Sequence, residues 1–151
     1  MDNHLQDSIE LSKQYFKAQS LVTMAFRQFI QYKLKIAKLD LTFEMLQVLS
    51  YLSDKEGVNQ QEIANATVKD KASLTYLIDN LTGRELVYRQ EDGQDRRNKL
   101  IFLTPKAKEL LEVTLIPYIE EMYSRVTDNV SNEELKTVIE VINKMTTNLK
   151  V

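Results

Sequence analysis

The residues of this sequence best suited to chemistry are bases gathered in one polar turn. Arg96, Arg97 and Lys99 fall within four residues, shortly after the turn-forming pair Asp92-Gly93. Cationic side chains neutralise phosphate, and a guanidinium on a narrow hairpin can enter the minor groove of duplex DNA, where the potential is deepest. Asp95, two residues before Arg97, could hold that guanidinium extended through a charge-assisted bond. The alternative is a solvated hairpin with an ordinary surface ion pair.

A second polar group faces outward from a predicted helix over residues 71–81, for which Asp70 is the predicted N-cap. The apolar positions of this helix recur at the i, i+3, i+4, i+7 spacing and are Leu74, Leu77, Ile78 and Leu81. The opposite face carries Ala72, Ser73, Tyr76, Asp79 and Asn80. Hydroxyl and amide groups of this kind read base edges or hold phosphate, and Lys69, just before the helix, can neutralise one. The alternative is the polar face that any surface helix has.

Helix caps and scarce glycine and proline define the elements that must position these groups. The chain has three glycines and two prolines, and long stretches without either favour helices. Apolar residues spaced by three and four predict one long amphipathic helix over residues 5–39. Thr42 is the predicted N-cap of the next helix, which Gly57 ends. Asn59 and Glu62 form a capping-box pattern that opens a short helix.

The sequence period then changes from that of helices to that of strands. Residues 86–90 and 99–103 predict two short strands joined by the polar connection 91–98. Since a lone hairpin is marginally stable, this ribbon must pack on neighbouring helices. Thr104-Pro105 is a strong helix start, and we expect Pro117 to kink the long helix that follows.

A last capping box, from Ser131 to Glu134, opens the final predicted helix. The predicted fold is therefore mainly α with a small β-hairpin. Within it, a helix of about eight residues, a short turn and a second helix with a polar outer face describe a helix-turn-helix. The second helix of such a pair can lie in the major groove of DNA.

Side chains for catalysis and metal binding are scarce. The absence of cysteine excludes a disulfide framework, a thiolate zinc site and a cysteine nucleophile. The single histidine, His4, cannot build a histidine-rich metal site. Adjacent acid pairs such as Glu120-Glu121 and Glu133-Glu134 point about 100° apart on a helix and do not converge on a substrate. With no phosphate-binding or nucleophile motif either, we expect no enzyme, no cofactor and no metal.

The charge of the chain is more informative in its distribution than in its total. The formal net charge is −2, with 28% charged and 43% hydrophobic residues, as in ordinary globular proteins. Residues 12–39 carry six bases and no acid. Bases gathered on one face suffice for DNA binding, because phosphate contacts are local; a solvated helix flank is the alternative. A start unlike a signal peptide and the lack of a membrane-length apolar run lead us to expect a soluble, cytoplasmic protein.

Residues 42–110 resemble the winged helix-turn-helix core of the MarR family of bacterial transcription factors. The resemblance rests on four stretches in matching order: Leu41-Thr42 with Leu46 and Leu49, then Gln60-Gln61-Glu62-Ile63-Ala64, then Lys71-Ala72-Ser73-Leu74-Thr75 with Leu81, then Asp95-x-Arg97 followed by Leu103-Thr104. The last is the most specific, because it is similar to the signature of the family's wing. Long flanking helices extend the match to nearly the whole chain, 1–151.

The resemblance implies a homodimer that binds a pseudo-palindromic operator, usually represses transcription and is often released by a small-molecule ligand. It assigns residues 42–104 to the DNA-binding lobe and residues 5–38 and 105–149 to dimerisation helices, whose apolar stripes are also too long to be satisfied within a small lobe. Arg97 matches the wing arginine and Asp95 its supporting acid. From the residues and the resemblance together, the predicted DNA contacts are Lys69, Lys71, Ser73, Thr75, Tyr76, Asn80, Arg96, Arg97 and Lys99.

The sequence departs from the family at two positions of the lobe. Family members often have arginine where Tyr76 stands, and they usually have glycine where Glu85 stands. Base readout by this chain can therefore differ, and the helix end near Gly83 can be shifted. An alternative function is a helical protein–protein adaptor that keeps the architecture without binding DNA.

Overall fold

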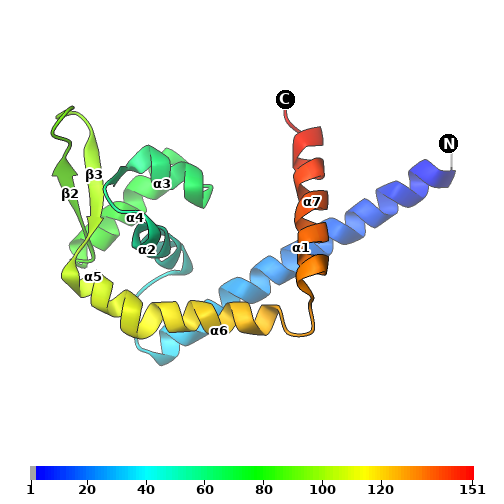
Figure 1. The fold of residues 1–151 in the computed structure, drawn as a ribbon, viewed down its shortest axis with the longest axis horizontal. Helices are drawn as coiled ribbons and strands as arrows, with labels where there is room; N and C mark the ends of the chain where they lie inside the picture. The colour runs from blue at the N-terminus through cyan, green and yellow to red at the C-terminus, as the bar shows by residue number, and fades with distance from the viewer. Residues whose placement is uncertain (1–2) are drawn as a thin grey trace. The chain divides into compact units, whose positions relative to one another are not determined.

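The computed structural model describes residues 3–151 and confirms a mainly helical chain with a small antiparallel sheet (Figure 1). Its elements are, in chain order, α1 (Asn3–Ile36), α2 (Phe43–Asp54), β1 (Val58–Asn59), α3 (Gln60–Thr67), α4 (Lys71–Gly83), β2 (Val87–Glu91), β3 (Lys99–Leu103), α5 (Pro105–Leu110), the π-helical turn η1 (Leu111–Leu115), α6 (Ile116–Val126) and α7 (Asn132–Asn148). The chain divides after Ile119 into two units. The predicted first helix ends three residues earlier than expected, at Ile36.

Five helices begin at the side-chain caps that the sequence predicts. In each, the cap oxygen accepts a hydrogen bond from a backbone N–H three residues later, and the caps are Thr42, Asn59, Asp70, Thr104 and Ser131. Each bond satisfies an amide that the helix leaves unpaired. At Ser131 the capping box is complete, because Glu134 accepts from the Ser131 N–H at 2.8 Å. At Asn59 the predicted box is altered, because the Glu62 carboxylate accepts from Lys55 Nζ at 3.1 Å.

The core of the first unit lies among α2, α3, α4 and the sheet. Its completely buried side chains include Leu49, Leu52, Ile63, Leu74, Ile78, Leu81 and Ile101. The helical members recur every three or four residues, whereas in β3 the buried Ile101 and Leu103 are separated by the less buried Phe102, so two periodicities meet in one core. Burying a leucine or isoleucine of this kind contributes about 1.5–3 kcal/mol. This core fixes the helix pair against the sheet.

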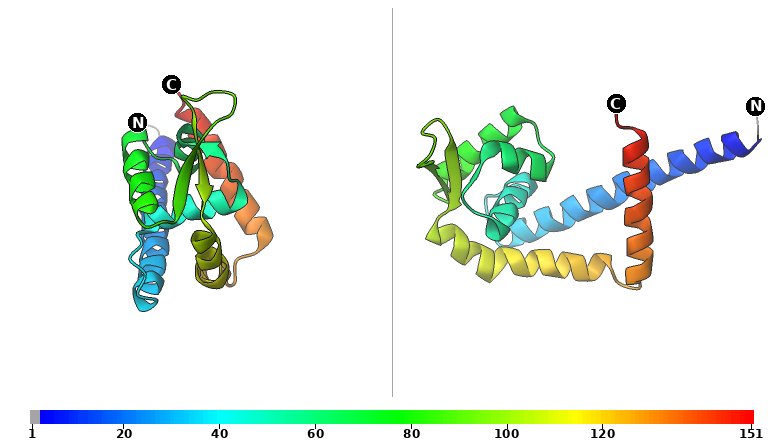
Figure 2. Two further views of the ribbon diagram at one scale, coloured as in Figure 1. Left: turned by 90° about the vertical axis from the view of Figure 1, so that its left-hand side faces the viewer. Right: turned by 45° about the horizontal axis from the view of Figure 1, so that its top comes forward.

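The sheet has three antiparallel strands in the order β1-β3-β2, one more than the two-stranded ribbon that the sequence predicts. The register of the β2–β3 hairpin runs from Val87 opposite Leu103 to Glu91 opposite Lys99. The extra strand, β1, is only two residues long and pairs Val58 with Ile101. Two residues are too few to produce a period, which is why the pattern missed it. The loop joining β2 and β3 lies at the end of the hairpin remote from α5 (Figures 1 and 2).

Gly57 leads the chain into β1 in a conformation that glycine adopts without strain. Its φ of 69° is in the left-handed region. A Cβ at this position would lie 3.1 Å from two ring carbons of Phe102, which is closer than ordinary van der Waals contact. The Gly57 N–H donates to Ile101 O at 2.9 Å and so continues the pairing of β1 with β3. The joint predicted at Gly57 is therefore also a point of close approach to the sheet.

The turn after α4 places a left-handed residue at Glu85 rather than at a glycine. The helix ends at Gly83, and Glu85 has a φ of 59°. This is the position at which the resembled family usually has glycine. An L-residue in this conformation costs roughly 1–2 kcal/mol. The Glu85 carbonyl accepts from Thr104 Oγ1 at 2.7 Å, which holds the strained turn against the start of α5.

The disturbance expected at Pro117 takes the form of a π-helical turn just before it. Within η1 the Ile116 N–H donates to Leu111 O, five residues back, instead of four. Proline has no N–H to give to the carbonyl of Val113, and its ring crowds that carbonyl. A widened turn relieves both conflicts. The helical path therefore continues through Pro117 as α6.

The two terminal helices keep many apolar side chains exposed. In α1 the buried apolar side chains are Ile30 and Leu34, near its C-terminal end. Its exposed large apolar residues are Leu5, Ile9, Leu11, Phe16, Leu21, Val22, Met24, Tyr32 and Ile36. In the second unit, α7 exposes Val138, Ile139 and Val141. Within the described part of the chain, no helix is both long and apolar enough to cross a membrane.

Candidate nucleic-acid interface

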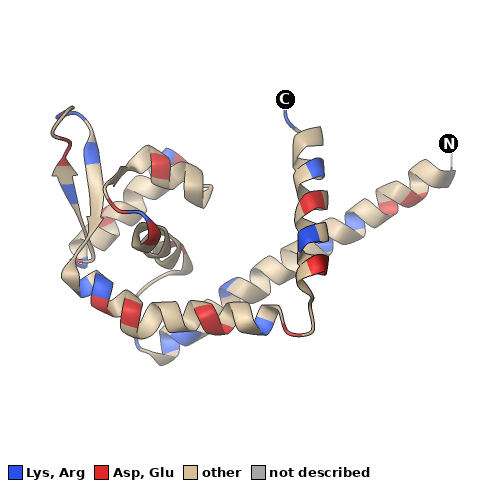
Figure 3. Cartoon of the chain, viewed as in Figure 1, with Lys and Arg blue, Asp and Glu red and all other residues tan. Residues whose placement is uncertain are grey.

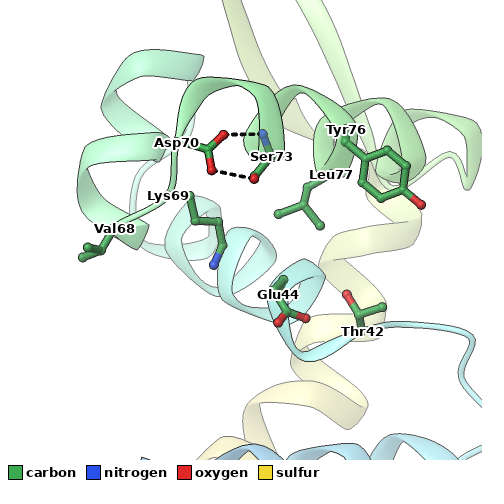
Figure 4. A pocket seen from close by; sticks show the side chains of 8 residues that line it. All are labelled: Thr42, Glu44, Val68, Lys69, Asp70, Ser73, Tyr76 and Leu77. Atoms are coloured by element: carbon green, nitrogen blue, oxygen red, sulfur yellow. Dashed lines mark hydrogen bonds between the residues drawn. The ribbon is translucent and has the colours of Figure 1, made fainter.

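A short turn joins α3 to α4 and sets the start of α4. Val68 has a left-handed φ of 52°, and the Lys69 N–H donates to Ala64 O at 2.9 Å, which closes α3. Asp70 then accepts two bonds from Ser73, from its N–H at 2.8 Å and its Oγ at 2.7 Å (Figure 4). The bond from the Ser73 N–H is the main reason that the pKa of Asp70 is lowered. A helix-turn-helix is thus in place, as predicted.

The face of α4 predicted to be free of the core is exposed. Ala72 and Ser73 are exposed, and Tyr76 is 67% exposed. The opposite face is buried through Leu74, Leu77, Ile78 and Leu81, as the spacing predicts. A helix with this division can enter a groove of DNA without disturbing its own packing.

Several of the predicted contact residues on α4 are oriented by bonds within the lobe. Thr75 Oγ1 donates to Lys71 O at 2.9 Å and accepts from Gln60 Nε2 at 3.1 Å. Asn80 Nδ2 donates to Tyr76 O at 2.9 Å. Ser73 Oγ is bonded to Asp70, as described above. These contacts fix side-chain positions along the exposed face, and the DNA-binding roles of the residues stay predictions.

Lys69 borders a groove of about 610 Å³ between the start of α2 and α4 (Figure 4). The Lys69 ammonium donates to Gln47 Oε1 at 2.8 Å. Beside it lies Glu44, which is paired with Arg27. Partial burial works to raise the pKa of Glu44, but hydrogen bonding and the charges of Arg27 and Lys69 outweigh it, so the pKa is lowered. Lys69 is therefore bonded to α2, and its predicted DNA contact stays a prediction.

The hairpin of β2 and β3 is here called the wing, and residues 92–98 are the wing loop. Two aspartates shape this loop by bonding to backbone amides. Asp92 Oδ1 accepts from the Gln94 N–H at 3.0 Å, and Asp95 Oδ1 accepts from the Arg97 N–H at 3.0 Å. The expected bond from Asp95 to the Arg97 guanidinium is replaced by this backbone bond, because an aspartate readily bonds the amide two residues on in a turn. Arg96 and Arg97 are exposed on the loop that Asp95 shapes.

The cross-strand pair at the base of the loop joins an acid to a base. Lys99 Nζ donates to Glu91 Oε1 at 2.8 Å, across the register that places these residues opposite each other. The hydrogen bond from Lys99 is the main reason that the pKa of Glu91 is lowered. Bases mark both wing strands and the loop between them in Figure 3. Such a pair at an exposed site contributes little stability, but it holds the strand ends together.

The structure brings the wing and the start of α4 together around one pocket that no acid lines. The pocket has a volume of about 380 Å³. Its lining residues are Asn59, Gln60, Gln61, Lys71, Arg97, Asn98 and Lys99. Lys71, Arg97 and Lys99 are predicted DNA contacts from two regions far apart in the sequence, and here they border one concavity. Three cations around a space of this size suit a phosphate group.

Sequence reasoning missed the residues that connect α3 and the wing to α4. Asn59 and Gln61 line the basic pocket, and Gln60 bonds to Thr75. Arg89, on β2, bonds to both Gln60 and Asp79. The strand pattern could have flagged Arg89, because it shares a face with the buried Val87. Across residues 3–151, no three His, Asp or Glu side chains are grouped to hold a metal ion.

The fold and the exposed α4 beside a basic hairpin define a winged helix-turn-helix protein. The MarR family model matches residues 39–98. The transcriptional regulator HosA of Escherichia coli O157:H7 is 28% identical over 106 residues, which cover 70% of this chain and 78% of that protein. The crystal structure of the S. aureus MepR–DNA complex superimposes with a TM-score of 0.79 at 28% identity, covering 89% of this chain and 98% of that chain.

A MarR-family regulator from Methanosarcina mazei Go1 shows the same fold, with a TM-score of 0.74 at 22% identity, covering 90% of this chain and 96% of that chain. Residues 39–98 thus match the MarR family, whose members are transcriptional regulators and not enzymes, and the regulators HosA and MepR are similar to this chain over most of its length. The match agrees with the resemblance that the sequence motifs indicated for this part of the chain.

Proposed function

We propose that this regulator is a homodimer that binds a pseudo-palindromic DNA operator, with α4 in the major groove and the wing in the adjacent minor groove. The observation that supports this most directly is the acid-free pocket bordered by Lys71, Arg97 and Lys99, next to the exposed face of α4. Local gathering of cations lets a chain of net charge −2 bind a polyanion. The similar MepR has been solved as a complex with DNA.

Each group of residues then has a distinct role on the duplex. Ser73, Thr75, Tyr76 and Asn80 face base edges or nearby phosphates from α4, while Arg96 and Arg97 reach into the minor groove. Lys69, Lys71 and Lys99 neutralise phosphates. Asp95 supports the wing by fixing the turn on which Arg97 stands.

The exposed apolar residues of the terminal helices support dimerisation through residues 5–38 and 105–149. Leu11 is 65% exposed and Val22 is 51% exposed, although both lie on the predicted apolar stripe of α1. Apolar side chains repeated over so long a helix signal an interaction surface. A dimer presents two lobes, each to one half-site, so the operator shares the two-fold symmetry of the protein.

The dimer acts as a repressor in the cytoplasm, and a small molecule releases it from the operator. This part of the proposal rests on likeness to the family. It is tested by screening small aromatic acids for stabilisation in thermal unfolding and then for loss of DNA binding. A ligand that stabilises the protein and leaves the DNA complex intact contradicts the release mechanism.

Titration of a fluorescein-labelled duplex, taken from the DNA upstream of the chain's own coding sequence, tests DNA binding itself. We expect saturable binding that weakens steeply with salt, because phosphate neutralisation releases counterions. A scrambled duplex of equal length is the control and should bind more weakly. Absence of binding to either duplex at low salt overturns the proposal and favours the adaptor function.

A further inference from the structure

A polar cluster joins the wing to both helices of the helix-turn-helix. Its four members, here called the wing clamp, are Gln60 of α3, Thr75 and Asp79 of α4, and Arg89 of β2. One Arg89 terminal nitrogen donates to Asp79 Oδ1 at 2.6 Å and to Gln60 Oε1 at 3.2 Å. The Arg89 Nε also donates to Gln60 Oε1, at 3.3 Å. Gln60 Nε2 then donates to Thr75 Oγ1 at 3.1 Å, which completes a link across three elements.

The place of Arg89 in β2 explains how it reaches both helices. Side chains alternate along a strand, so Arg89 points to the same face as Val87, which is buried in the core. Arg89 stands opposite Ile101, also buried, in the middle of the hairpin. The Arg89 side chain is 29% exposed. A planar guanidinium can hold two acceptors in fixed directions, which a lysine cannot do.

The charges of Asp79 and Arg89 are better explained by their pairing with each other than by contact with DNA. Asp79 belongs to the exposed side of α4, where an unneutralised carboxylate repels phosphate. Arg89 neutralises it from within the lobe. The hairpin extends from this point to the loop that carries Arg97, so a small tilt at Arg89 is enlarged at the tip.

We propose that the wing clamp is a positioning device that fixes the wing relative to α4, so that the Arg97 loop and the exposed α4 face meet the same duplex. Arg89 and Asp79 contribute through this geometry and not through contact with DNA. The inference rests on the proposed DNA-binding function, since only a shared target requires the two elements to hold one orientation.

Replacing Asp79 distinguishes the wing clamp from direct electrostatics, because the two predict opposite signs. Asp79→Asn removes a negative charge from a DNA-facing helix, so simple electrostatics predicts tighter binding. The wing clamp predicts that binding weakens about fivefold or more on a duplex that the wild-type protein selects from a randomised pool. On a scrambled duplex of equal length, binding should be unchanged or tighter. Tighter binding to both duplexes overturns the proposal.

Arg89→Gln tests the arginine through the salt dependence of binding. If Arg89 only positions the wing, affinity for the selected duplex falls while the slope of log affinity against log salt stays that of the wild type. If Arg89 binds phosphate, the slope falls by about 0.9 for each lost contact, and the proposal is wrong. Arg84→Gln is the matched control, because it removes an arginine of similar exposure (33%) that pairs with Asp40 at 2.8 Å in the same unit. It should leave affinity for the selected duplex unchanged.

Hydrogen exchange of the wing amides gives a readout that needs no DNA. In Asp79→Asn and Arg89→Gln, amides of β2 and β3 should exchange faster than in Arg84→Gln. Equal exchange in all three variants overturns the wing clamp even if DNA binding is confirmed. If the wild-type chain binds no duplex but the exchange difference is present, the proposed function fails while the mechanical link remains.

Discussion

Arg97 is the side chain through which we expect the wing to contribute to DNA binding. It is exposed at the loop, borders the acid-free pocket, and its backbone N–H is fixed by Asp95. We predict that Arg97→Ala weakens operator binding by about 1–3 kcal/mol per lobe, since a groove contact by arginine is worth that much. Titration of the labelled duplex over a range of salt concentrations measures it.

The salt dependence of the same variant reports how many wings engage. An arginine in the minor groove also displaces counterions, so a dimer that loses Arg97 from both lobes should lose roughly 1.8 from the slope of log affinity against log salt. Arg84→Ala, which removes an arginine paired with Asp40, is the control and should leave the slope unchanged. Unaltered affinity in Arg97→Ala would remove the wing from the mechanism.

Glu85 is the residue at which the sequence and the backbone conformation conflict. With a φ of 59°, it stands in a region that glycine adopts without strain. We predict that Glu85→Gly stabilises the protein by about 0.5–1 kcal/mol, because relief of strain exceeds the entropy that glycine adds to the unfolded chain. Its 3.9 Å pair with Lys106 is exposed, and losing it costs little.

Urea unfolding measures the effect of Glu85→Gly, and an exposed helical glutamate supplies the control. Glu109→Gly places glycine within α5 and should destabilise by about 1 kcal/mol. Opposite signs for two Glu→Gly changes are expected from conformation alone. Destabilisation in both would mean that the turn after α4 does not hold Glu85 in the left-handed region.

The hydrogen-bond partners of individual side chains are harder to predict from the sequence than the exposure of those side chains. The exposed side of α4 follows from the spacing of four apolar residues, because helix geometry alone fixes the angle between positions. The partners of Arg89 and Lys69 depend on which elements pack together. Lys69 bonds to Gln47, 22 residues away along the chain, and no local pattern encodes that distance. The same holds for the pocket that Lys71 and Arg97 share.

At the scale of elements, the cap of α4 links the stability of this helix to pH. The bond from the Ser73 N–H, followed by that from the Ser73 hydroxyl, lowers the pKa of Asp70 from its ordinary value of 3.8. A carboxyl whose pKa is lowered by folding stabilises the protein fully above the ordinary pKa, and this contribution is lost as pH falls through the folded pKa.

Asp70→Asn keeps a cap oxygen but removes the titration, so stability should fall less steeply below about pH 4 than in the wild type. Urea midpoints measured across the acid range test this. Asp7→Asn, at an exposed position of α1, removes a carboxyl that caps nothing and should retain the wild-type slope. An unchanged acid slope in Asp70→Asn would show that the cap bond does not govern the titration.

Elements that start at caps were predictable, and elements imposed by neighbours were not. The starts of three helices are predictable from their N-caps, Thr42, Asp70 and Thr104, because each side chain accepts a hydrogen bond from the amide three residues later. The strand β1 forms because β3 offers it a free edge, and two residues carry no period of their own. The π-helical turn η1 results from Pro117, which the sequence marks as a disturbance without specifying its form.

At the scale of the whole molecule, DNA binding and dimerisation should fail together. The long helix α1 exposes apolar residues that one chain leaves uncovered. We predict that Leu11→Glu combined with Val22→Glu converts a dimer to a monomer, since buried unpaired carboxylates oppose association. Light scattering during size-exclusion chromatography measures the mass.

The same double variant should bind the operator far more weakly while each lobe stays folded. Two linked lobes gain from effective concentration, so a single lobe retains only the affinity for one half-site. Gln6→Glu is the control, because it adds a negative charge on the polar side of α1, away from the apolar stripe. It should remain dimeric and bind as the wild type does. If instead the double variant stays dimeric, α1 is not the joining surface; if it is monomeric and binds with full affinity, the two half-sites are not read by one symmetric molecule.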